Sequence, residues 1–242
     1  MAPPDVPLKF AFERQRICVE RPGRPPELRS VPHRVRNLTA AALRDPKKRA
    51  MLLHLFWHHE LQAAELMCWA LLSFPDTPPS FRRGLVRIAL DEMRHMQMYA
   101  EHIRSLGFKI GDFAINDWFW QRVPASESPA MFVSAMGVGF EAGNLDHGLR
   151  FASRFEEAGD LQAGRIQRTV VEEEIPHVAF GVHWLKRFAG VASFDVWRAH
   201  LVPPLSPMVM RGHPMAIEER TRAGQDEEFL ARLSMWSAMW SE

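Results

Sequence analysis

The 242-residue sequence has a formal net charge of +1, with 47% hydrophobic and 24% charged residues. This balance is ordinary for a globular protein, and it gives no electrostatic argument for binding nucleic acid, a membrane surface or a strongly acidic partner. The two cysteines, Cys18 and Cys68, are too few for a cysteine-rich metal site and fit a reducing, cytoplasmic location.

The first 44 residues are rich in Pro and Arg and lack helical periodicity, so residues 1–44 are predicted to form an extended arm that packs on the rest of the chain. Within the arm, residues 8–12 are compatible with a short strand. No basic stretch followed by an apolar one begins the sequence, so no signal peptide is expected. The longest apolar stretch, residues 51–74, contains His and Glu residues that a bilayer would tolerate poorly, and we expect no membrane span.

Residues 45–190 are predicted to form an all-α, antiparallel four-helix bundle. Capping residues followed by proline, and glycines beyond the last apolar positions, mark the helix ends. The four predicted helices begin near residues 46, 79–80, 129 and 160 and end near residues 73, 107, 158 and 189, respectively. Four long helices of similar length are the parts of a bundle. Residues 191–242 are expected to add C-terminal helices near residues 194–201 and 226–240 to the same domain.

Two short motifs place acidic and imidazole side chains together. Residues 91–95 read Asp-Glu-Met-Arg-His, and residues 173–177 read Glu-Glu-Ile-Pro-His. Positions three apart share one face of a helix, so Glu92 with His95, and Glu174 with His177, can each bind one metal ion.

The first and third helices are then expected to supply one inward glutamate each. Glu60 precedes Glu92 by 32 residues and Glu141 precedes Glu174 by 33, so both pairs return to similar heights in a helix hairpin. Glu65 is the rival of Glu60 on the first helix, and it otherwise lies beside the site.

Together these residues predict a carboxylate-bridged centre for two metal ions. The predicted ligands are Glu60, Glu92, His95, Glu141, Glu174 and His177. Four carboxylates balance two divalent cations, and the donor set suits two Fe ions, with Mn or a mixed Mn/Fe pair still open. Buried on apolar helix faces, such carboxylates need a shared cation or shared protons.

The repeated pattern of Glu followed by Glu-x-x-His resembles the ferritin-like superfamily of di-iron carboxylate proteins over about residues 46–189. The first motif also resembles the Asp-Glu-x-Arg-His motif of bacterial multicomponent monooxygenases, which implies that Asp91 holds His177 and Glu173 holds His95. The second motif departs from this pattern, with Glu173 for Asp and Pro176 for Arg. Over its whole length the chain most resembles an uncharacterised ferritin-like family, DUF455, which implies fold and metal site but no substrate.

Two further features lie near the predicted centre. Tyr99 follows His95 by four residues, at the offset of the radical tyrosine in ribonucleotide reductase small subunits, although ordinary core packing with its hydroxyl bonded to a ligand carboxylate is the simpler interpretation. Several glycines on the third helix, including Gly137 and Gly143, indicate either close helix packing or a cavity near Glu141.

The favoured function is a dioxygen-activating oxidase or oxygenase acting on a small organic substrate. It would use dioxygen or peroxide and draw on an electron-donor protein. Two alternatives stay open. One is an iron-handling or peroxide-detoxifying protein resembling ferritin or rubrerythrin, and the other is a tRNA-modifying hydroxylase, although acidic residues offset the arginines that would bind tRNA. A homodimer is compatible with the sequence.

Overall fold

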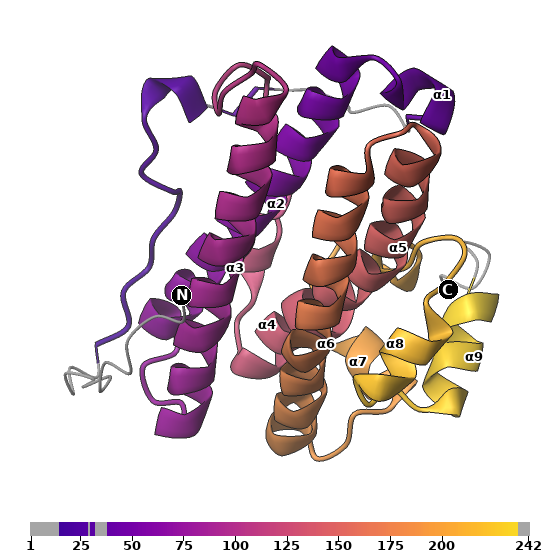
Figure 1. Cartoon of the computed structure of the whole chain (residues 1–242). Coiled ribbons are helices and arrows are strands. Elements are labelled where there is room, and N and C mark those ends of the chain that lie inside the picture. Colours follow the sequence, from indigo (N-terminus) through magenta and orange to yellow (C-terminus); the bar gives the residue numbers. More distant parts are fainter. Residues whose placement is uncertain (1–14, 29, 32–37, 237–242) are drawn as a thin grey trace.

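The computed structural model describes residues 15–28, 30–31 and 38–236, and within them every regular element is a helix (Figure 1). Residues 8–12, where a strand was considered, lie outside this part of the chain. Helix α2 (Pro46–Ser73) packs along α3 (Pro79–Ser105), and α5 (Ala142–Glu157) packs along α6 (Leu161–Ala189). The two hairpins meet where α3 contacts α6. The prediction of an all-α fold is confirmed.

The ends of the long helices follow local chemistry. The side chains of Asp45, Ser128 and Asp160 each accept a hydrogen bond from a backbone N–H of the first turn that follows. Gly107 and Gly190 end α3 and α6 with φ values of 85° and 86°, which side chains disfavour. The helix boundaries predicted from these residues are therefore confirmed to within a few positions.

The third long helix differs from the prediction. It begins as α4 (Pro129–Ala135), widens into a π-helical segment at Met136–Glu141, and continues as α5. The prediction of one regular α-helix was wrong in the middle, because tertiary contacts decide this segment. A Cβ on Gly137 would lie 2.7 Å from the Gly181 Cα of α6, so the two backbones meet almost directly. A π turn holds one extra residue, which shifts the direction in which Glu141 projects relative to the turns on either side.

The described part of the N-terminal arm is not free of helix, contrary to expectation. It contains a 3₁₀ turn at Pro26–Leu28 and the short helix α1 (Ala40–Leu43), which Thr39 caps. The arm is tied to α2 by a hydrogen bond from the Ile17 N–H to the Leu72 carbonyl. These contacts hold the arm along the outside of the long helices (Figure 1).

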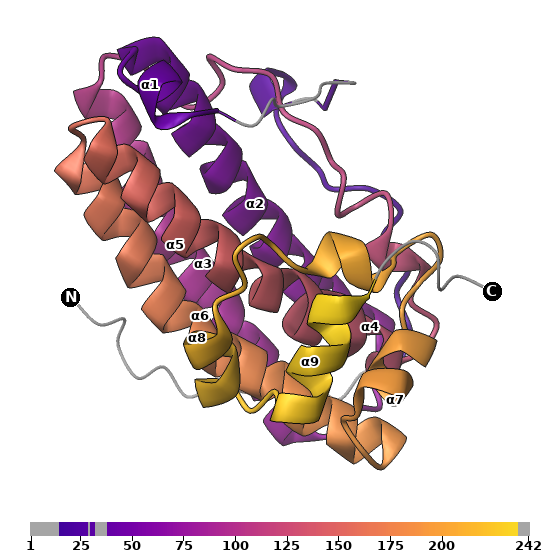
Figure 2. The same cartoon turned by 90° about the vertical axis from the view of Figure 1, so that its right-hand side faces the viewer.

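After α6 the chain forms α7 (Phe194–Ala199), a 3₁₀ turn at Pro207–Met210, α8 (Ile217–Arg222) and α9 (Glu227–Met235), which cover one side of α4, α5 and α6 (Figure 2). Helix α9 is shorter than predicted, because Trp236 already has an extended backbone with ψ of 127°. Residues 237–242 lie outside the described chain.

One buried ion pair fixes this C-terminal segment to α5. The Arg220 side chain is fully buried and donates to both Asp146 oxygens, with N···O distances of 2.8 Å. Asp146 also accepts hydrogen bonds of 2.7 Å from the backbone N–H groups of Gly212 and Ala216. A single carboxylate thus holds three points of the returning chain.

The apolar core contains three clusters of buried residues: two large parts, one toward each end of the long helices, and a smaller cluster that joins α5, α6 and the C-terminal segment. The first includes Leu66, Phe81 and Phe132, and the second includes Leu53 and Ile166. The predicted metal ligands occur between these two parts in all four long helices. None of the helices that the structure describes has both the length and the apolar character to cross a membrane.

We expect Asp160→Ala to lower the free energy of unfolding by about 2 kcal/mol, because Asp160 caps α6 and also contacts His102 and Arg49. Burial alone would raise its pKa, but the hydrogen bonds from His102 and Ala163, together with the nearby charges, lower it. This stabilisation is therefore present above the unfolded-state pKa and is lost as the pH falls through the lowered folded-state pKa.

Denaturant titrations at several pH values measure both effects. Asp45→Ala is the matched control, since Asp45 caps α2 with one exposed hydrogen bond, and we expect a loss of about 1 kcal/mol. Equal losses for the two variants, or a loss at Asp160 that persists in strong acid, would contradict the interpretation.

We expect Arg220→Met to lower the free energy of unfolding by about 3–5 kcal/mol, because it leaves the buried Asp146 carboxylate without its cation. Limited proteolysis should then cut within residues 203–225. Arg222→Met serves as the control, because Arg222 forms only an exposed pair with Glu172, and its denaturation midpoint should match the wild type. Similar behaviour of the two variants would show that Arg220 does not anchor this segment.

Candidate metal centre

The six predicted ligands all lie between the two parts of the core. Each is buried, with at most 4% of its surface exposed. They are Glu60 on α2, Glu92 and His95 on α3, Glu141 at the end of the π segment, and Glu174 and His177 on α6. One donor atom from each of Glu60, Glu92, His95 and Glu174 lies within 4.8 Å of the others, so this buried cluster could hold a metal ion.

The Nδ1 atoms of both imidazoles face the carboxylates. His95 Nδ1 lies 3.1 Å from Glu92 Oε2, 3.7 Å from Glu174 Oε1 and 3.9 Å from Glu60 Oε2. His177 Nδ1 lies 2.9 Å from Glu174 Oε2 and 3.1 Å from Glu92 Oε1. A ring nitrogen carries at most one proton, so each Nδ1 has more acceptors around it than it can satisfy.

Glu92 and Glu174 therefore span both imidazoles. The two oxygens of Glu92 face different histidines, and those of Glu174 do the same. The ring centroids of His95 and His177 are 6.1 Å apart. The cluster has an approximate two-fold arrangement, in which each Glu-x-x-His motif serves its own histidine and that of the other helix.

Outer carboxylates hold the opposite side of each imidazole. His95 Nε2 lies 2.9 Å from Glu173 Oε2, and His177 Nε2 lies 3.3 Å from Asp91 Oδ2. Arg94 donates to both outer carboxylates, at 2.6 Å to Glu173 and 3.1 Å to Asp91. Both histidine contacts cross between α3 and α6, as the resemblance implied. A proton on Nε2 leaves the Nδ1 lone pair free to face a cation.

The pKa value of each group in the cluster depends strongly on the charges of its neighbours. Burial alone would lower the pKa of His95, but the carboxylates of Glu60, Glu92 and Glu174 raise it to about 11. Burial, together with the charges of Glu92 and Glu174, raises the pKa values of Glu60 and Glu141 well above their ordinary range. Charges packed this closely need either shared protons or a shared cation.

The donor set fits a pair of metal ions of the iron or manganese class. Glu141 Oε1 is buried and makes no hydrogen bond within the described chain. An unpaired carboxylate oxygen is unusual in a protein interior, and it is suited to coordinate a cation. The set comprises four carboxylates and two imidazoles, and on α3 and α6 a glutamate and a histidine stand three residues apart. These are the donors found in carboxylate-bridged two-metal sites.

Two of the predicted neighbours have other partners. Glu65 accepts hydrogen bonds from Arg24 Nε at 2.9 Å and from Trp120 Nε1 at 2.8 Å, so both of its oxygens are engaged away from the six residues. The Tyr99 hydroxyl accepts a hydrogen bond from Gln167 Nε2 at 3.0 Å, and it is buried in the core. Burial, with the charges of the nearby carboxylates, raises the pKa of Tyr99.

The sequence did not reveal the polar network around Arg24. This buried guanidinium comes from the arm and contacts Glu65, Asp117 and His58. It therefore joins the arm, α2 and the loop before η2 (Val123–Ala125), which is a 3₁₀ turn. Glu65 and His58 on a largely apolar helix were the available signal, but their cationic partner lies far away in sequence.

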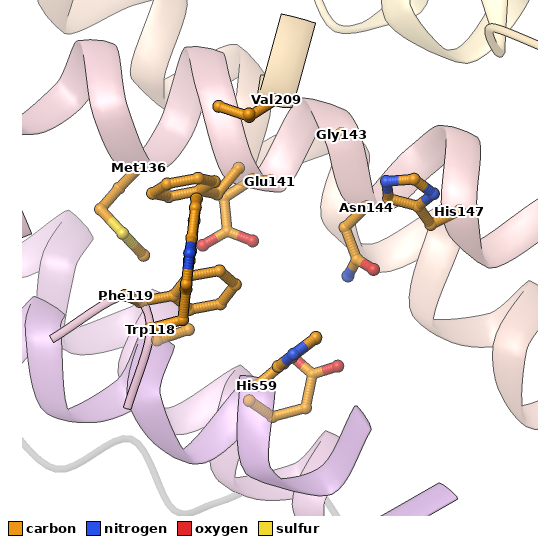
Figure 3. A pocket seen from close by; sticks show the side chains of 12 residues that line it. His59, Trp118, Phe119, Met136, Glu141, Gly143, Asn144, His147 and Val209 are labelled. Atoms are coloured by element: carbon orange, nitrogen blue, oxygen red, sulfur yellow. The ribbon is translucent and has the colours of Figure 1, made fainter. Parts of the chain in front are cut away.

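A cavity adjoins the cluster, and its lining was also only partly foreseen (Figure 3). Its volume is about 170 Å³, and both Glu60 and Glu141 line it. Asn144 lines it too and donates to Glu174 Oε1 at 3.4 Å. The spacing of Asn144 from Glu141, one turn along the same helix, could have indicated this contact. The glycines of the third helix serve both expected purposes, since Gly137 allows close packing and Gly143 lines the cavity.

Comparisons with known proteins place the chain in a family without assigning a reaction. The sequence profile of a family described as "Protein of unknown function (DUF455)" matches residues 6–231. An uncharacterised protein of Haemophilus influenzae is 26% identical over 124 residues, which cover 49% of this chain and 42% of that relative. The match therefore spans less than half of the relative's length. No solved structure matches the chain.

We expect Glu60→Gln to reduce the metal content of the purified protein, whereas Glu65→Gln should retain it. Only Glu60 belongs to the cluster, and Glu65 is occupied by Arg24 and Trp120. Metal analysis by plasma mass spectrometry, with circular dichroism to verify folding, compares the two variants. Loss of metal from the Glu65 variant alone would identify Glu65 as the ligand from α2.

Proposed function

This chain belongs to the DUF455 family, and we propose that it is a ferritin-like protein whose buried centre binds two metal ions, most suitably iron, to activate dioxygen. The proposed ligands are Glu60, Glu92, His95, Glu141, Glu174 and His177. We further propose that residues 45–190 form a ferritin-like four-helix bundle, with residues 1–44 as an arm and residues 191–242 as an extension of the same domain.

One observation carries this proposal, namely the crossed arrangement of the two motifs. Glu92 and Glu174 each reach both imidazoles, while Asp91 and Glu173 hold the outer nitrogens from the opposite helix. A chance pair of Glu-x-x-His motifs on solvated helix faces would not be buried, inward-facing and linked in this way. The arrangement supports a centre built for two cations of similar size and charge.

The chain's own residues divide into those that hold the centre and those that face the cavity. His95 and His177 would bind through Nδ1, since Nε2 of each is engaged by an outer carboxylate. When bound, two ferrous ions would supply the electrons that reduce dioxygen. Glu60 and Glu141 lie between the centre and the cavity, so a substrate there would approach from their side.

The cavity favours an oxidase or oxygenase over an iron-handling or peroxide-detoxifying role, because neither iron storage nor peroxide removal requires a pocket for an organic molecule beside the centre. Dioxygen chemistry on an organic molecule also requires an electron donor, and such a partner protein stays a prediction. A cytoplasmic location and a homodimer also stay predictions. The two free thiols, Cys18 and Cys68, agree with the cytoplasmic location.

We expect the natively purified protein to contain about two iron or manganese ions per chain, and the ferrous-loaded protein to consume dioxygen on mixing. Glu92→Ala and His177→Ala should lose at least about tenfold in metal affinity, and with it the dioxygen consumption. Metal analysis and an oxygen electrode measure these quantities.

Glu172→Ala is the control on the same helix. The exposed Glu172 side chain pairs with Arg222 and does not face the cluster, so the metal content and oxygen consumption of the variant should equal those of the wild type. Stoichiometric metal in both Glu92→Ala and His177→Ala would refute the ligand assignment. Metal binding without dioxygen consumption would instead leave a metal-binding protein that is not an oxidase.

A further inference from the structure

The cavity beside the candidate metal centre has one aromatic side. Phe119 stacks on Phe140 with ring centroids 4.7 Å apart, and Trp118 meets Phe140 edge-on at 5.4 Å. In Figure 3 the Glu141 carboxylate lies between the side chains of Trp118 and Phe119 and that of Asn144. Aromatic walls of this kind favour a flat apolar ligand, because ring faces and edges pack with complementary charge distributions.

Hydrogen bonds fix the aromatic wall in place. Gln62 Oε1 on α2 accepts from the backbone N–H groups of Phe119 and Trp120, at 3.2 and 3.4 Å. Arg122 lies over the Trp118 ring, 4.0 Å from its centroid, and donates to the Trp118 carbonyl. The wall is therefore held by the adjoining helix and by its own loop before any ligand arrives, as small-molecule sites commonly are.

The rest of the cavity lining is polar. Asn144 and His147 lie away from the aromatic wall, as Figure 3 shows, and His59 borders the wall, with its ring centroid 5.0 Å from that of Phe119. Arg150 Nη2 donates to His147 Nδ1 at 2.8 Å, which leaves Nε2 as the ring position for a proton when this imidazole is neutral. The amide of Asn144 offers both a donor and an acceptor. One polar group on a ligand could thus find partners on this side while its apolar part lies against the aromatic wall.

The charge of the lining limits what can bind. None of the cavity-lining residues in the described chain is Lys or Arg, so an anion would have no cationic side chain to meet. The acidic groups in the lining, Glu60 and Glu141, are the proposed metal ligands, and the four ligand carboxylates balance the charge of two divalent cations, so no carboxylate of the lining is left to pair with a positively charged molecule. An uncharged molecule avoids both penalties.

Size gives the last restriction. The volume of about 170 Å³ is close to that of engineered apolar cavities of about 150 Å³ that hold benzene. A single six-membered ring with a short substituent therefore fits, whereas a fused polycyclic molecule does not.

From these observations we infer that this cavity is the substrate site and that it binds a small, uncharged, single-ring aromatic molecule carrying one polar substituent. This inference rests on the proposed function, because it takes Glu60 and Glu141 to be occupied by metal. It adds the chemical class of the substrate, which the metal centre alone does not define.

Three probes with the same ring test the inference on the full-length, metal-loaded protein. They are benzyl alcohol, benzylammonium and benzoate, which differ in charge. Isothermal titration and saturation-transfer NMR measure their binding. We expect saturable binding of benzyl alcohol at one site per chain, at least about tenfold tighter than that of either charged probe.

A matched pair of variants locates the binding site. Val209 lines the cavity and is 46% exposed, so Val209→Trp should narrow the cavity without disturbing the core. Val191 is 47% exposed and does not line the cavity, and Val191→Trp serves as the control. We expect Val209→Trp to weaken benzyl alcohol binding at least about tenfold and Val191→Trp to leave it unchanged.

Three outcomes would overturn the inference: no saturable binding of benzyl alcohol, equal or tighter binding of a charged probe, or equal binding to Val209→Trp and the wild type. Metal content measured on the same samples separates this inference from the proposed function. A protein that holds two metal ions but fails the probe test retains the metal centre and loses only this substrate class. A protein that holds no metal loses the proposed function, and with it the basis of this inference.

Discussion

Four carboxylates buried between two apolar core regions impose the strongest physical demand in this molecule. Each charge removed from water costs several kcal/mol unless nearby groups compensate it. Here the compensation comes from two imidazoles that lie among the carboxylates; Asp91 and Glu173 hold these imidazoles from outside, and Arg94 donates to both outer carboxylates. The four long helices are packed so that these side chains lie together between the two core regions.

The geometry of the third long helix decides whether its glutamate reaches the other carboxylates. The π segment ends at Glu141, and the near contact of Gly137 with Gly181 brings the third helix against α6 beside the cluster. Irregular helical turns at such positions redirect a side chain without interrupting the helix. Asp146, five residues after Glu141, has a different role, because it anchors the C-terminal segment through Arg220. Successive turns of the same long helix thus contribute a residue to the candidate centre and a residue that holds the C-terminal segment.

The arm and the loop before η2 extend this organisation to the cavity. Arg24 ties the arm to Glu65 on α2 and to Asp117 in the loop, and the next residues of that loop form the aromatic wall. The wall therefore depends on an arm and a loop that carry no proposed metal ligand, and also on Phe140 and Gln62, which lie beside Glu141 and Glu60. If the cavity holds the substrate, the loop contributes to substrate choice from outside the ligand-bearing helices, whereas Phe140 and Gln62 connect the wall to those helices.

The sequence by itself determined the local features. Proline and capping residues marked the long helices, and the Glu-x-x-His spacing put Glu92 with His95 and Glu174 with His177, because these depend on neighbours within one helical turn. Tertiary structure alone decided the rest. It selected Glu60 rather than Glu65 for the cluster, since Glu65 is paired with an arginine 41 residues away. It also produced the π segment, the Asp146–Arg220 anchor and the cavity, because each arises where segments far apart in the chain meet, and spacing along one helix holds no record of such contacts.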